Sequence, residues 1–337
     1  MARLERVCPY FRMMYVQVTT GFVVLLVGAE LLVRGAVAVA RRLGVLPLVV
    51  GMTVVAFGTS APELVVGMKA ALAGAPGIAL GNVIGSNIAN VLLVLGGAGL
   101  VKALVISGRA LRMDAAVLVV GSVLFAGLSW RGDIGLGSGM VLLAVFLAFL
   151  AYTYWRETRP AAVGARRQVG EERATGSTAG SLWIGGTVLA VGIAGVVYGA
   201  ELLVEGSVTM ARAIGISEEV IGLTLIAIGT SLPELVTSIV AVVRGHVDVA
   251  LGNVVGSNLF NVLGIVGAVA VVSPLAVSVQ FRAFDLWVML GASLLLAYSL
   301  LGHRRLGRGA AAAMLGAYGA YVAVQGYGVD AFIPWLG

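Results

Sequence analysis

Two glutamates, Glu63 and Glu234, sit inside long apolar stretches, and each one ends a Gly-Thr-Ser-x-Pro-Glu segment. A carboxylate at membrane depth is costly, so it marks an ion pathway or a paired charge. No basic residue lies deep enough in matching segments to pair with both glutamates. The carboxylates are therefore candidate ligands for a cation.

The prolines of these segments add further oxygen ligands. Within a helix, Pro62 releases the carbonyl of Gly58 from hydrogen bonding, and Pro233 does the same for Gly229. A carbonyl released inside a bilayer needs another partner, which a cation can be. Ser60 and Ser231 contribute hydroxyl oxygens. Thr59 and Thr230 lie one turn before the glutamates, on the same face.

A second polar motif, Gly-Asn-x-x-Gly-Ser-Asn-x-x-Asn, follows each glutamate. This motif places a serine and an asparagine four residues apart, on one face of a helix. The pairs are Ser86 with Asn90 and, in the second copy, Ser257 with Asn261. Asn82 and Asn253 either cap or cross-link helices, or support the ligands. Without His or Cys, this oxygen set disfavours zinc and copper and suits Ca²⁺ better than Mg²⁺.

Both motifs belong to a block that occurs twice. Residues 51–96 and 222–267 align without a gap at an offset of 171 residues, and 24 of 46 positions are identical. Gly28–Val33 recurs at the same offset as Gly199–Val204. A duplicated polar block inside apolar segments predicts one site built from two halves.

The composition places these blocks in a membrane. The 337 residues are 60% hydrophobic and 11% charged, against about 25% charged in soluble domains. We predict an all-α polytopic membrane protein with ten transmembrane helices arranged as two inverted five-helix repeats. The spans are expected near 15–40, 44–73, 78–103, 112–129, 135–155, 182–212, 216–243, 248–272, 284–301 and 309–326.

The predicted organisation is an N-terminal tail (1–14), a first repeat (15–155), a cytoplasmic linker (156–181) and a second repeat (182–337). Loop Lys and Arg place the linker inside and both termini outside. The net charge of +6 follows from these loops, so we expect no nucleic-acid partner. The single cysteine, Cys8, excludes an internal disulfide.

Other acidic residues are expected to have structural roles. Arg34 lies one turn from Glu30, so an ion pair near the membrane surface is predicted there. Asp114 and its copy Asp285 open their predicted spans, where they would stabilise helix starts.

The duplicated motifs resemble the alpha repeats of the cation/Ca²⁺ exchanger superfamily, and of prokaryotic sodium/calcium exchangers within it. The resemblance covers nearly the whole chain. It implies alternating access, in which the first and sixth helices slide across an eight-helix core. It assigns Glu63 and Glu234 to the central Ca²⁺ site. The other implied ligands are the carbonyls of Thr59, Thr230, Ala56 and Ala227, the hydroxyls of Ser60, Ser86, Ser231 and Ser257, and the Asn90 amide.

Asn261 departs from relatives that carry Asp there, such as potassium-dependent exchangers. Two carboxylates neutralise one Ca²⁺, so the expected function is electrogenic, K⁺-independent exchange of Na⁺ for Ca²⁺. An H⁺/Ca²⁺ antiporter is the first alternative, and a cation channel is the second. We expect a monomer in the lipid bilayer of a prokaryotic cell membrane, with no cofactor and no enzymatic activity.

Overall fold

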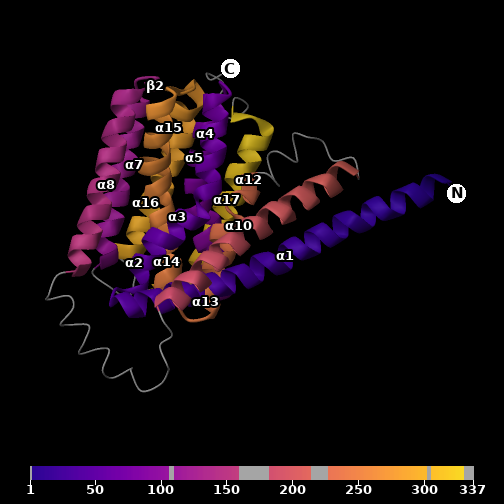
Figure 1. The fold of residues 1–337 in the computed structure, drawn as a ribbon. Helices are drawn as coiled ribbons and strands as arrows, with labels where there is room; N and C mark the ends of the chain where they lie inside the picture. The colour runs from indigo at the N-terminus through magenta and orange to yellow at the C-terminus, as the bar shows by residue number, and fades with distance from the viewer. Residues whose placement is uncertain (1, 106–109, 159–181, 214–226, 302–304, 330–337) are drawn as a thin grey trace.

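The computed structural model describes residues 2–105, 110–158, 182–213, 227–301 and 305–329, and these are almost entirely helical (Figure 1). The first half comprises α1 (Ala2–Leu43), α2 (Pro47–Val50), η1 (Gly51–Val55), α3 (Ala56–Thr59), α4 (Ala61–Leu72), α5 (Pro76–Ala89), η2 (Asn90–Leu95), α6 (Gly96–Val101), α7 (Ala110–Ser129) and α8 (Leu136–Thr158). The second half comprises α10 (Leu182–Ala213), α12 (Ala227–Gly229), α13 (Leu232–Val243), α14 (Val247–Leu259), η4 (Phe260–Ile265), α15 (Val266–Val272), η5 (Phe281–Asp285), α16 (Leu286–Leu301) and α17 (Arg308–Tyr327). The η segments are short π-helical turns.

Among the described residues, six helices are long and apolar enough to cross a membrane, and a seventh span results if the bent pair formed by α2–α3 and α4 counts as one. Helix α1 begins at Ala2, so helical hydrogen bonding continues through the segment predicted as a tail. The predicted linker lies mostly outside the described residues, at 159–181. The count of ten spans stays a prediction.

Helices α1 and α10 lie side by side and project together away from the bundle (Figure 1). Glycines let their backbones touch. A Cβ added to Gly192 would lie 2.3 Å from the Leu32 amide nitrogen, and one added to Gly199 would lie 2.4 Å from that of Leu25. Small residues permit such close packing between membrane helices. The two helices therefore form one tightly joined pair.

The helices that carry the polar motifs occupy the interior of the bundle. In the span Val247–Val272, 89% of an apolar 18-residue stretch is buried inside the bundle, and in the span Pro76–Val101 72% of such a stretch is buried. Helices α7 and α8 flank them on one side in Figure 1. Helix α4 lies toward the upper end of the bundle in this view, and α13 lies toward the lower end.

Two short antiparallel ladders tie distant loops together. Strand β1 (Leu104–Val105) pairs with β4 (Arg305–Leu306), and β2 (Asp133–Ile134) pairs with β3 (Leu275–Ala276). Strands β1 and β3 are separated by the repeat offset of 171 residues, and Ile134 and Arg305 are separated by the same offset. Each ladder thus joins one half of the chain to the other.

Candidate cation-binding site

The helix breaks predicted from the two prolines are present at matching positions. Ser60 separates α3 from α4 with φ −91° and ψ 8°, and Ser231 precedes α13 with φ −92° and ψ 3°. The helices on either side of Ser60 are bent by 43°. The two serines adopt nearly the same backbone conformation because each precedes a proline that cannot continue the hydrogen-bond ladder.

The two halves meet through these broken helices. The Ser60 hydroxyl donates to Glu234 Oε1 at 2.8 Å, across 174 positions of sequence. Both residues are fully buried, and so are Glu63, Thr59 and Ser231. Ser60 directly precedes α4, in which Glu63 is the third residue, so this bond joins the segments that carry the two carboxylates. Two acidic groups from separate halves thus share one enclosed site.

Several buried oxygens of the motifs have no hydrogen-bond partner in the part of the chain that the structure describes. They are Glu63 Oε1 and Oε2, Glu234 Oε2, Ser231 Oγ, Ser257 Oγ, Asn87 Oδ1, Asn90 Oδ1 and Asn261 Oδ1. Leaving a buried polar atom unpaired is costly, so a concentration of such atoms calls for a ligand. Within the described ranges, no third His, Cys, Asp or Glu joins the two glutamates as a metal cluster. A hard cation held by carboxylate, hydroxyl and amide oxygens fits these atoms.

The remaining predicted ligands lie around this set. Ser86 and Asn90 are buried, and the Asn90 amide donates to Asn258 Oδ1 at 3.4 Å. Thr230 is half-buried beside the break. The Ala56 carbonyl accepts both the Ser60 amide N–H at 3.0 Å and the Thr59 hydroxyl at 3.4 Å. Ala227 begins α12, but its side chain lies outside what the structure describes.

The two asparagines whose roles were open make contacts between helices. Asn82 donates to the Glu63 carbonyl at 3.2 Å. Asn253 accepts from Thr59 at 3.2 Å and donates to Ser238 at 3.2 Å. Sequence analysis missed Ser238, although its place one turn after Glu234 was a usable signal. These bonds orient the helices that carry the glutamates.

Two π-helical turns also went unpredicted. Segment η2 begins at Asn90, and η4 begins at Phe260, directly before Asn261. Single π turns in α-helices occur often at functional sites because they re-aim side chains and loosen backbone hydrogen bonds. Their matching positions place both asparagines at comparable points of the two halves.

The prediction for Asp114 and Asp285 as helix-start residues was wrong. Asp114 lies inside α7 and forms a buried ion pair with Arg156 at 3.0 Å. Asp285 accepts hydrogen bonds from Gln280, Tyr321 and Gln325. Except for Gln280, which lies five residues before Asp285, the partners of these carboxylates are distant in sequence. The predicted Glu30–Arg34 pair is confirmed at 2.6 Å, and Glu30 also binds Arg244 at 2.7 Å.

A bundle of apolar helices around a buried acidic site from two halves defines a membrane transporter for hard cations. The sodium/calcium exchanger protein family model matches residues 13–155 and 184–327. The chain is 36% identical to the putative antiporter CaxA of Alkalimonas amylolytica, over 86% of this chain and 90% of that protein. It is 33% identical to the inner membrane protein YrbG of Escherichia coli strain K12, over 90% and 94%.

Among solved structures, the sodium/calcium exchanger from Methanococcus jannaschii superposes with a TM-score of 0.79 at 31% identity, covering 93% of this chain and 98% of that one. The chain belongs to the sodium/calcium exchanger family. It is a cation/Ca²⁺ antiporter, integral to the prokaryotic cell membrane and crossing it several times. Transporter relatives fit the expectation that it is not an enzyme, and they set the channel alternative aside.

Proposed function

We propose that this chain exchanges Na⁺ for Ca²⁺ by alternating access, with Glu63 and Glu234 as the central ligands. The observation that carries the proposal is the set of buried side-chain oxygens without a partner among the described residues, because eight of these ten come from the two repeated motifs. Among the proposed ligands, each half supplies one carboxylate, two serine hydroxyls and one asparagine amide. This donor set suits Ca²⁺, and it also suits Na⁺ ions that occupy the same oxygens in turn.

Charge sets the proposed stoichiometry. Glu63 and Glu234 are the only acidic residues among the buried polar residues of the two motifs. Their two charges neutralise one Ca²⁺, whereas three Na⁺ leave one positive charge in excess. Exchange of three Na⁺ for one Ca²⁺ would therefore move net charge and respond to membrane potential.

Na⁺ is proposed over H⁺ as the driving ion because the second motif carries amides where a proton carrier needs an acid. Asn90 and Asn261 take these positions. An amide oxygen can bind Na⁺, but the amide does not titrate in the physiological range. The other ligands proposed from the resemblance are Thr59, Thr230, Ala56, Ala227, Ser60, Ser86, Ser231 and Ser257.

The proposed mechanism uses ten spans in two inverted repeats, with the joined α1 and α10 pair moving against the remaining helices. Support comes from the matching breaks at Ser60 and Ser231 and from two ladders, each of which pairs a strand of one half with a strand of the other. The glycine contacts between α1 and α10 favour movement of both helices as one body.

Purified protein in sealed proteoliposomes tests the proposal. Vesicles loaded with Na⁺ should take up Ca²⁺ when diluted into Na⁺-free buffer. Because one net positive charge leaves the vesicle in each cycle, a membrane potential that is negative outside should speed the exchange. Uptake driven by a pH gradient without Na⁺ would instead identify an H⁺/Ca²⁺ antiporter. Uptake that is insensitive to voltage would contradict the three-to-one stoichiometry.

A further inference from the structure

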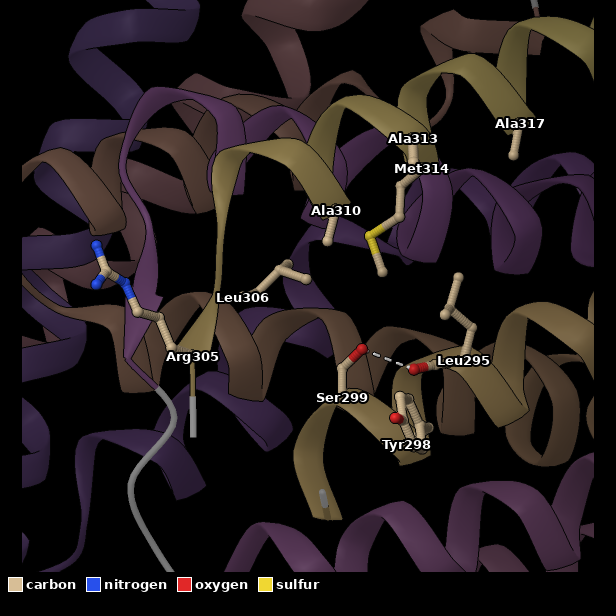
Figure 2. A pocket seen from close by; sticks show the side chains of 9 residues that line it. All are labelled: Leu295, Tyr298, Ser299, Arg305, Leu306, Ala310, Ala313, Met314 and Ala317. Carbon is tan, nitrogen blue, oxygen red and sulfur yellow. Dashed lines mark hydrogen bonds between the residues drawn. The ribbon is translucent and has the colours of Figure 1, made fainter. Parts of the chain in front are cut away.

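An apolar groove runs between α16 and α17, and no residue of the two motifs lines it. It has a volume of about 290 Å³ and is lined by Leu295, Tyr298, Ser299, Arg305, Leu306, Ala310, Ala313, Met314 and Ala317 (Figure 2). The Ser299 hydroxyl donates to the Leu295 carbonyl at 2.8 Å, which meets its hydrogen-bonding need within the helix. Apart from Arg305 at its end, the groove presents mainly hydrocarbon.

A basic pocket adjoins this groove. It measures about 470 Å³ and is lined by Lys102, Ala103, Arg305, Gly307 and Arg308. Arg305 lines both hollows, and Figure 2 shows it at the far end of the groove from Ala317. No acidic residue is among the described residues that line either hollow. The β1–β4 ladder holds the pocket in shape by pairing Arg305 with Val105.

The positive charge belongs to one end of the bundle only. The residues 171 positions from Lys102, Arg305 and Arg308 are Ser273, Ile134 and Gly137, and none of them is charged. The corresponding hollow at the β2–β3 end is lined by both Arg131 and Asp133, so its charges are mixed. The repeat architecture therefore does not account for the three cations.

We propose that the groove and the basic pocket together bind a phospholipid with a net negative headgroup. The groove would take an acyl chain, and Lys102, Arg305 and Arg308 would hold the headgroup. Arg308 keeps donors for this purpose beyond the one that it gives to the Val101 carbonyl at 3.3 Å. Basic pockets between membrane helices bind anionic headgroups in this way.

A second copy of the chain fits this surface less well, because a symmetric contact would bring the same three cations together. The pocket also lies on the side that the loop charges predict to be cytoplasmic. Basic residues near the cytoplasmic leaflet are attracted to its anionic lipids. Charge and position thus both favour a lipid over a protein partner.

Native mass spectrometry of the full chain in detergent tests the headgroup contacts, with dioleoyl-phosphatidylglycerol and dioleoyl-phosphatidylcholine as probes. Wild type should retain phosphatidylglycerol preferentially. Each of Lys102→Gln, Arg305→Gln and Arg308→Gln should weaken its binding about fivefold, and the triple variant about 100-fold. Arg131→Gln, in the mixed-charge hollow, is the control and should bind as wild type does. All these side chains are at the surface, so the variants should fold normally. A melting temperature equal to that of the wild type will verify this for each variant.

The groove needs its own variant. Ala313→Trp should reduce binding of the dioleoyl lipid while leaving weak binding of dihexanoyl-phosphatidylglycerol, whose chains are too short to fill the groove. Equal retention of the two dioleoyl headgroups would overturn the proposal, as would an undiminished triple variant. A dimer of the wild type that Ala313→Trp dissociates would overturn it in favour of a protein interface.

Discussion

The hydroxyl of Ser60 donates to the carboxylate of Glu234 at 2.8 Å, whereas the equivalent hydroxyl of Ser231 has no partner among the described residues. The two serines occupy the same motif position and have nearly the same backbone angles. The halves are therefore in different states within one structure. An alternating-access cycle would exchange these two states, so that Ser231 comes to face Glu63.

This asymmetry predicts different effects for the two serines without ions. Ser60→Ala removes a buried hydrogen bond to a carboxylate, worth about 1.5–3 kcal/mol if the carboxylate is charged, and should lower the melting temperature in ion-free buffer. Ser231→Ala removes a hydroxyl without a partner and should leave it nearly unchanged. Both should reduce the rise in melting temperature that Na⁺ produces. Equal losses of stability in ion-free buffer would contradict the asymmetry.

Neutralising either glutamate should abolish Ca²⁺ transport. Glu63→Gln and Glu234→Gln each leave a divalent ion with one compensating charge in a fully buried site. The two variants should be similarly severe, since each removes the one carboxylate of its half. Ca²⁺ uptake into proteoliposomes measures the effect, and size-exclusion chromatography controls for folding. Near-normal uptake by either variant would remove that residue from the site.

The ion pair between Glu30 and Arg244 should favour the conformation described here. Glu30 belongs to α1 and Arg244 follows α13, so the pair joins the proposed moving helices to the rest of the bundle. Position 73, which is equivalent to Arg244, is Ala73, so no matching pair can form in the opposite state. A partly exposed pair contributes up to about 1 kcal/mol, which shifts such an equilibrium about fivefold.

Arg244→Gln should therefore change the apparent Ca²⁺ affinities on the two sides of the membrane in opposite directions. Flux measured in oriented vesicles with Ca²⁺ on either side provides the test. Arg34→Gln is the matched control, because Arg34 pairs with the same Glu30 but belongs to α1 and would move with it. Identical behaviour of the two variants would show that the Arg244 pair has no role in the transition.

The exchanger should not require K⁺, because two carboxylates cannot neutralise K⁺ together with Ca²⁺. Proteoliposomes loaded with Na⁺ should take up Ca²⁺ equally well with K⁺ or an inert cation outside. Asn261 is fully buried among the unpartnered groups, so Asn261→Asp should add a charge there and alter cation or pH dependence. Wild-type behaviour of this variant would place Asn261 away from the ions, and a strict K⁺ requirement would contradict the prediction itself.

The close packing of α1 on α10 should be sensitive to single methyl groups. Gly192→Ala places a Cβ 2.3 Å from the Leu32 amide nitrogen, so the helices must separate, at a cost of about 1–3 kcal/mol. Gly186→Ala on the same helix is the control, because no described atom lies within 4 Å of its added Cβ. Thermal unfolding should separate the two variants clearly, and equal melting temperatures would show that the contact is not tight.

The sequence by itself determined what is local or repeated. A proline ends helical hydrogen bonding wherever it occurs, so the breaks at Ser60 and Ser231 could be predicted from Pro62 and Pro233 alone. The duplication identified the oxygen-bearing residues, because polar side chains that recur at the same positions of two apolar segments are best explained by a shared function. The pairing of Glu30 with Arg34 followed from helical spacing.

Tertiary structure decided which partners these groups have. Asp114 binds Arg156, 42 positions away, and Glu30 binds Arg244, 214 positions away. Local spacing carries no information on such pairs, since helix packing brings them together. The Ser60–Glu234 bond depends further on the conformation, because identical motifs make different contacts in the two halves. Sequence symmetry predicts equivalent ligands, and only the packed structure breaks that symmetry.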